Sequence, residues 1–133
     1  MLKFDHIALS VSSLANSIAF YQQLGFVPAQ RWDNPDGTLA IALLKNENAI
    51  LELFCYKNAH ALPEYRQELS NDLQTIGTKH FALCTNNIQQ SAKDLSAKGI
   101  CKNPKILTGR LGRDYFFIKD PDGILIEIIQ ANN

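Results

Sequence analysis

Apolar residues along the chain recur with two spacings, one typical of helices and the other of strands. The i, i+4, i+7 spacing of a helical face occurs in two segments. These segments carry Leu14, Ile18 and Tyr21 in the first case and Ile88, Ala92 and Leu95 in the second. Each is followed by a glycine, Gly25 or Gly99, a residue that accepts the left-handed backbone common after a helix. The pattern predicts two helices with matched ends.

Short polar residues precede both predicted helices. Ser12 or Ser13 stands before the first, and Asn86 or Asn87 stands before the second. Their side-chain oxygens can accept hydrogen bonds from first-turn amides that otherwise have no partner. Both helices are therefore expected to be N-capped.

Apolar stretches interrupted by turn residues predict one β-hairpin in each half of the chain. The first has strands at 38–44 and 49–54 around the turn 45–48, and the second has strands at 115–118 and 124–129 around the turn 120–123. Shorter strands are expected near residues 27–32 and 104–108, where Pro28 and Pro104 limit pairing.

The order of these elements repeats. The segment from Phe4 to Leu9 matches that from Thr78 to Leu83 at an offset of 74, and the two hairpins match at an offset of 75. Each half then reads β-α-β-β-β. A solenoid generally needs three or more repeats, and the chain has two.

We therefore predict an α+β fold in a single domain spanning residues 1–133. It consists of two paired βαβββ modules that form curved mixed sheets around a cleft. The first module covers about 1–56, the connector about 57–76, and the second module about 77–133. Within the connector, Pro63 is placed to begin a short helix.

Composition narrows the classes of partner. The 133 residues carry 13 Lys and Arg against 13 Asp and Glu, so the chain lacks the basic excess of a nucleic-acid-binding protein. No stretch has the roughly 18 consecutive apolar residues of a membrane span, and the N-terminus does not resemble a signal peptide. A cytoplasmic protein is expected. Its three cysteines form no close pair and are interpreted as buried free thiols.

Two histidines and two glutamates interrupt apolar rows on the predicted strands. His6 and His80 occupy equivalent positions of the repeat, and so do Glu52 and Glu127. A lone histidine in a strand is more often a hydrogen-bonded core residue than a ligand, but the repetition of both residue types favours a metal site. His60, in the connector, has no counterpart and is interpreted as solvated.

Two imidazoles and two carboxylates suit a borderline divalent ion. Zn²⁺ or Ni²⁺ is favoured, with Co²⁺, Mn²⁺ or Fe²⁺ as alternatives, over copper(I) or Ca²⁺. Such an ion can polarise a carbonyl, and a nearby glutamate can act as a general base. Glu52 and Glu127 are thus candidates for both metal binding and proton transfer, in an isomerisation or epimerisation beside a carbonyl.

Four further residues are candidates for contacting a small-molecule substrate. Arg110 and Arg113 lie before the second hairpin and can meet an anionic group, although most exposed arginines are only solvated. Phe54 and Phe117 are spaced to share a sheet face with the proposed ligands, although aromatic residues in strands are often ordinary core.

The sequence resembles the vicinal oxygen chelate superfamily of glyoxalases, bleomycin-resistance proteins and extradiol dioxygenases. The resemblance covers the whole chain and is carried by residues 5–11, 20–26, 51–54, 79–83 and 120–127. It implies paired βαβββ modules, a divalent metal held by His6, Glu52, His80 and Glu127, and a homodimer whose ligands come from one chain or both.

The resemblance also narrows the activity. A His, Glu, His, Glu ligand set is similar to that of glyoxalase I, a lactoylglutathione lyase that isomerises a hemithioacetal through an enediolate. Methylmalonyl-CoA epimerases usually have Gln at the position of Glu52, and dioxygenases of the superfamily lack a carboxylate there. Glutathione-dependent bacterial glyoxalases typically have Arg where this chain has Ser10. The resemblance therefore does not say which thiol forms the substrate.

These features lead to one principal functional hypothesis. We expect a metal-dependent, glyoxalase I-like lyase or isomerase acting on a small α-oxo or α-hydroxy (thio)ester-type substrate. The alternatives are a small-molecule-binding resistance protein, which generally lacks a complete ligand set, and a dioxygenase or epimerase of the same superfamily.

Overall fold

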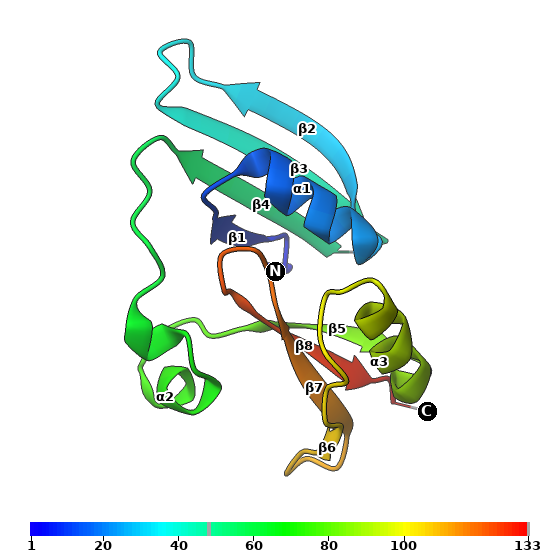
Figure 1. The fold of residues 1–133 in the computed structure, drawn as a ribbon. Coiled ribbons are helices and arrows are strands. Elements are labelled where there is room, and N and C mark those ends of the chain that lie inside the picture. Colours follow the sequence, from blue (N-terminus) through cyan, green and yellow to red (C-terminus); the bar gives the residue numbers. More distant parts are fainter. Residues whose placement is uncertain (48, 133) are drawn as a thin grey trace. The chain divides into compact units, whose positions relative to one another are not determined.

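The chain divides into two compact units, Met1–Ala61 and Leu62–Asn133. The computed structural model describes residues 1–47 and 49–132 (Figure 1). Asn48, in the predicted turn 45–48, lies outside the described residues. Residues 62–76 of the predicted connector group with the second unit.

The first unit is a four-stranded mixed sheet with one helix. Its elements are β1 (Ile7–Ser10), α1 (Leu14–Gln23), β2 (Val27–Asp33), β3 (Leu39–Asn46) and β4 (Ala49–Tyr56). The strand order is β1-β4-β3-β2, with β1 parallel to β4 and the other neighbours antiparallel. Helix α1 lies along one face of this sheet (Figure 1).

The second unit repeats this plan after two short helical segments. It contains η1 (Glu64–Arg66), α2 (Leu69–Gln74), β5 (Phe81–Thr85), α3 (Ile88–Ala97), β6 (Leu107–Thr108), β7 (Asp114–Lys119) and β8 (Leu125–Gln130). The strand order is β5-β8-β7-β6, and β5 is parallel to β8. The predicted α+β class and both βαβββ modules are confirmed. The strand expected at 104–108 is reduced to two residues, consistent with the missing amide proton of Pro104.

Both helices begin as the sequence predicts. The Ser13 hydroxyl oxygen accepts a hydrogen bond from the Asn16 amide at 3.2 Å, and the Asn87 side chain accepts one from the Gln90 amide at 3.0 Å. Gly25, which follows α1, has a φ of 94° that a residue with a side chain would adopt only with strain. Caps and glycine together set where each helix starts and stops.

Each sheet has one buried face and one half-buried face. Leu51 and Leu53 of β4 and Ile126 and Ile128 of β8 point to the buried faces. Alternate residues of the same strands, Glu52 and Glu127 among them, lie on the other face and keep partial solvent access. The cysteines are free thiols as predicted, but the prediction that they are buried is wrong. Cys55 and Cys101 are half-buried, and Cys84 is exposed because it lies on this second face of β5.

The described helices are short. None of them is long and apolar enough to cross a membrane.

Candidate functional site

The two His–Glu pairs have the same strand register. In the first unit Glu52 is in register with Ala8, two residues after His6. In the second unit Glu127 is in register with Ala82, two residues after His80. Because side chains two residues apart in an extended chain share a face, each histidine comes diagonally next to its glutamate. One sequence repeat thus builds the same juxtaposition twice.

In the first unit, His6 makes two contacts with carboxylates. Its Nε2 lies 2.9 Å from Oε2 of Glu52, and its Nδ1 lies 2.6 Å from Oδ2 of Asp5. The hydrogen bond to Asp5 raises the pKa of His6 above its usual value of 6.5, with a further contribution from the charge of Glu52. The Nε2 lone pair that would hold the extra proton is also the one available to a metal ion.

In the second unit, His80 Nε2 lies 3.2 Å from Oε2 of Glu127. The imidazole stands edge-on to the ring of Phe117, with centroids 4.8 Å apart. Its other nitrogen, Nδ1, is buried and has no hydrogen-bond partner among the described residues. The side chains of His80 and Glu127 are 20% and 18% exposed. His80 therefore presents Nε2 toward the carboxylate, as a ligand would.

The donor chemistry of the two pairs fits a borderline divalent ion. Each pair offers one imidazole nitrogen and one carboxylate oxygen, the donor types that zinc and related ions accept. Within either unit the described residues bring together only two of the four predicted ligands, and they contain no group of three or more His, Cys, Asp or Glu side chains that could hold a metal.

The predicted substrate residues fall into two groups. Phe117 is in register with Glu127 and contacts His80, and Phe54 lies two residues after Glu52 on the same face of β4. Arg113 instead donates a hydrogen bond from Nε to the carbonyl oxygen of Gln130 at 2.8 Å. Arg110 is exposed in the turn before β7. The aromatic candidates therefore lie beside the His–Glu pairs, whereas within the described part of the second unit no contact joins either arginine to His80 or Glu127.

Two polar residues near the pairs were missed by sequence reasoning. Asp5 precedes His6 and holds its Nδ1, and Asp72 is a buried carboxylate on α2. Asp5 was identifiable as an acid adjacent to a candidate ligand. Asp72 carried no such signal, because its partners Arg66 and Lys79 lie outside α2, on the segments before and after that helix.

Comparison with known proteins supports the interpretation of the fold. The model of the glyoxalase/bleomycin resistance protein/dioxygenase superfamily matches residues 3–128, nearly the whole chain. The chain belongs to this superfamily. The match includes all four predicted ligands, from His6 to Glu127.

Relatives within the superfamily include named lyases and proteins without a described activity. The chain is 27% identical over 138 residues to a lactoylglutathione lyase of Schizosaccharomyces pombe, covering 96% of this chain but only 45% of that protein. It is 31% identical over 137 residues to the uncharacterised protein YwbC of Bacillus subtilis, covering 96% of this chain and 97% of the relative. Among solved structures, a glyoxalase family protein from Enterococcus faecalis has a TM-score of 0.81 at 24% identity, with 96% of both chains covered. Membership of the superfamily thus rests on both sequence and fold.

Proposed function

We propose that this protein is a metal-dependent, glyoxalase I-like lyase or isomerase. It acts on a small α-oxo or α-hydroxy (thio)ester-type substrate through an enediolate. His6, Glu52, His80 and Glu127 would together hold one divalent ion, most simply Zn²⁺ or Ni²⁺. The proposal also includes a homodimer, the assembly expected for this superfamily.

The observation that carries this proposal is the repeated His–Glu pair. Two imidazole nitrogens approach two carboxylate oxygens at 2.9 and 3.2 Å from equivalent strand positions. A half-buried carboxylate on an otherwise apolar face costs free energy unless it is paired or bound to a cation. Duplication of that feature in both units favours a shared function over two unrelated structural contacts.

The glutamates would supply proton transfer. When bound, the ion would provide Lewis-acid polarisation of a substrate carbonyl. Glu52 or Glu127 takes the proton from the carbon beside that carbonyl, and the proton returns to the neighbouring carbon. The substrate is isomerised without an external oxidant or reductant. Partial exposure of both carboxylates, 23% and 18%, leaves them accessible to a small molecule.

Apolar side chains next to the glutamates favour a substrate with an uncharged carbon group near the reacting atoms. Leu43 and Phe117 are in register with Glu52 and Glu127, respectively. Phe54 extends the same face of the first sheet. Arg110 and Arg113 remain candidates for an anionic end of the substrate, Arg110 with the freer side chain because the Arg113 Nε is already bonded.

An enzyme assay with several thiols tests the proposed activity. Methylglyoxal is mixed with glutathione or with other low-molecular-weight thiols, and thioester formation by the metal-loaded protein is followed by absorbance. We expect turnover with at least one hemithioacetal, and the same turnover in His60→Ala, which removes an exposed histidine outside both pairs. Binding of substrates without turnover of any would support the small-molecule-binding alternative instead.

A further inference from the structure

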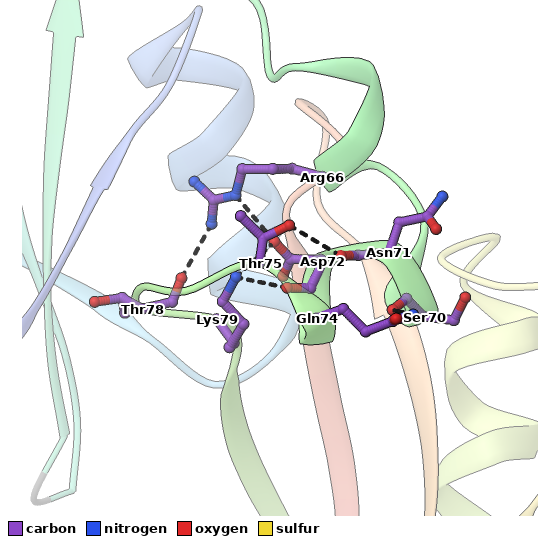
Figure 2. A network of polar contacts seen from close by, with 8 residues as sticks. All are labelled: Arg66, Ser70, Asn71, Asp72, Gln74, Thr75, Thr78 and Lys79. Atoms are coloured by element: carbon purple, nitrogen blue, oxygen red, sulfur yellow. Dashed lines mark hydrogen bonds and ion pairs between the residues drawn. The ribbon is translucent and has the colours of Figure 1, made fainter.

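A buried carboxylate joins three segments of the second unit just before β5. Asp72 on α2 lies with Oδ1 3.0 Å from Nε of Arg66 and 3.2 Å from Nζ of Lys79. Lys79 also donates to the carbonyl oxygen of Asp72 at 2.6 Å, and Arg66 donates from Nη2 to the carbonyl oxygen of Thr78 at 3.2 Å. Figure 2 shows these four residues, here named the Asp72 cluster, converging from η1, α2 and the segment that leads into β5.

Asp72 is one of the most buried polar residues described, with its side chain 3% exposed. Burial raises the pKa of this carboxyl, but the hydrogen bonds from Arg66 and Lys79 outweigh that effect, and the net pKa lies below the usual value. An ionised carboxylate at such a position is retained only when it is paired. The cluster is therefore a fixed point of the unit rather than a mobile surface contact.

This fixed point adjoins His80. Two members of the Asp72 cluster, Thr78 and Lys79, directly precede His80 in the sequence, and β5 begins only at Phe81. Consecutive side chains of an extended segment point to opposite sides, so an anchored Lys79 directs His80 to the face on which Ala82 and Glu127 lie. His80 precedes the paired part of the strand, and the cluster provides the restraint on its N-terminal side.

The two units support their histidines differently. The residue before His6 is Asp5, which bonds directly to the imidazole Nδ1. The equivalent residue before His80 is Lys79, which bonds away from the ring to Asp72, while the Nδ1 of His80 has no partner among the described residues. Metal-binding histidines usually have their second nitrogen held by a hydrogen bond. His80 lacks that support, so its orientation has to come from the backbone and from Phe117.

We propose that Asp72, acting through Lys79, is a positioning residue that orients His80 for metal binding. The predicted effect on metal affinity rests on the proposed function. The orientation of the His80 imidazole, by contrast, is a property of the metal-free protein. Asp72 and Lys79 do not contact the metal or the substrate in this account. They set where the His80 imidazole stands relative to Glu127.

Two readouts test the proposal in the full-length protein with variants Asp72→Asn and Lys79→Met. The first is the nuclear Overhauser effect between the His80 and Phe117 rings in the metal-free protein, whose centroids are 4.8 Å apart. The second is Co²⁺ affinity, followed by visible absorption. We expect both variants to lose or weaken the ring contact and to bind Co²⁺ about 10- to 100-fold more weakly. Lys79→Arg should restore both properties toward wild type.

Asp33→Asn is the matched control, because it breaks an exposed ion pair with Arg31 in the other unit and should change neither readout. If Asp72→Asn and Lys79→Met fold and keep the wild-type ring contact between His80 and Phe117, the proposal is overturned. It is also overturned if both variants fail to fold, because the two residues would then have a merely structural role. If the wild type binds no Co²⁺, the proposed function fails, but the ring contact still decides whether Asp72 positions His80.

Discussion

His80 and Glu127 face each other across two parallel strands, with Nε2 and Oε2 separated by 3.2 Å. The register that produces this contact, with Glu127 beside Ala82, recurs for His6 and Glu52 beside Ala8. The repeat therefore conserves a relationship between side chains as well as an order of elements.

Replacing either glutamate by glutamine should impair turnover. Glu52→Gln and Glu127→Gln keep side-chain size but remove the basic carboxylate, and loss of a general base typically lowers the rate by about 10²- to 10⁴-fold. Steady-state kinetics with the active hemithioacetal measure the effect. Unchanged kcat in one variant would assign proton transfer to the other glutamate, and unchanged kcat in both would contradict the proposed chemistry.

Removing the Asp5 carboxylate should lower the pKa of His6. The hydrogen bond that His6 donates to the Asp5 carboxylate is the main reason that this pKa exceeds 6.5, so Asp5→Asn should move it back toward that value. Because the folded-state pKa is raised, the associated stability is fully present below about pH 6.5 and is lost as the pH rises through the folded-state pKa. Imidazole NMR titration of the metal-free protein measures the shift, and Asp33→Asn should leave it unchanged.

Asp72→Asn should destabilise the protein near neutral pH, by about 1–3 kcal/mol, because Arg66 and Lys79 lose a buried acceptor that is charged. The pKa of Asp72 is lowered on folding, so its contribution is present above the unfolded-state value of about 3.8 and is lost as the pH falls through the lower folded-state value. Urea unfolding at pH 3 to 7 should show the variant and wild type converging in acid. A constant difference across this range would contradict the ionised, paired state of Asp72.

Truncating a buried leucine of β4 should destabilise the protein far more than truncating an exposed leucine in the turn before β7. Leu53 has no exposed surface and lies on the buried face, so Leu53→Ala should cost about 2–5 kcal/mol. Leu111→Ala removes the same atoms from a side chain that is 99% exposed and should change the free energy of unfolding by less than about 0.5 kcal/mol. Similar losses for the two variants in urea unfolding would mean that the assigned buried face is wrong.

Local sequence signals were sufficient to predict most of the fold. Helix caps at Ser13 and Asn87 and the alternation around Glu52 and Glu127 depend on neighbouring residues only, and the internal repeat aligned the two halves. The same repeat identified the His–Glu pairs as candidates. The resemblance to the superfamily then supplied the expected ligand set and activity.

Contacts between polar residues on different segments of the chain were not predictable in the same way. Asp72 gains its role from Arg66 and Lys79, which sit on separate segments with no common periodicity. Arg113, a candidate for meeting an anionic substrate, has its Nε bonded to the Gln130 carbonyl oxygen, a long-range contact that composition and spacing do not encode. All three cysteines were expected to be buried, but Cys55 and Cys101 are half-buried and Cys84 is exposed, because burial depends on which face of its element each thiol occupies.

Metal content at known protein concentration tests the central claim most directly. Elemental analysis for Zn, Ni, Co, Mn and Fe should be made on wild type, His80→Ala, Glu127→Ala and the control His60→Ala, after reconstitution with each ion. The account predicts close to one divalent ion per chain in wild type and His60→Ala, and loss of that ion in the other two variants. Wild-type protein that binds no metal, or variants at His80 and Glu127 that retain it fully, would contradict the four-ligand site.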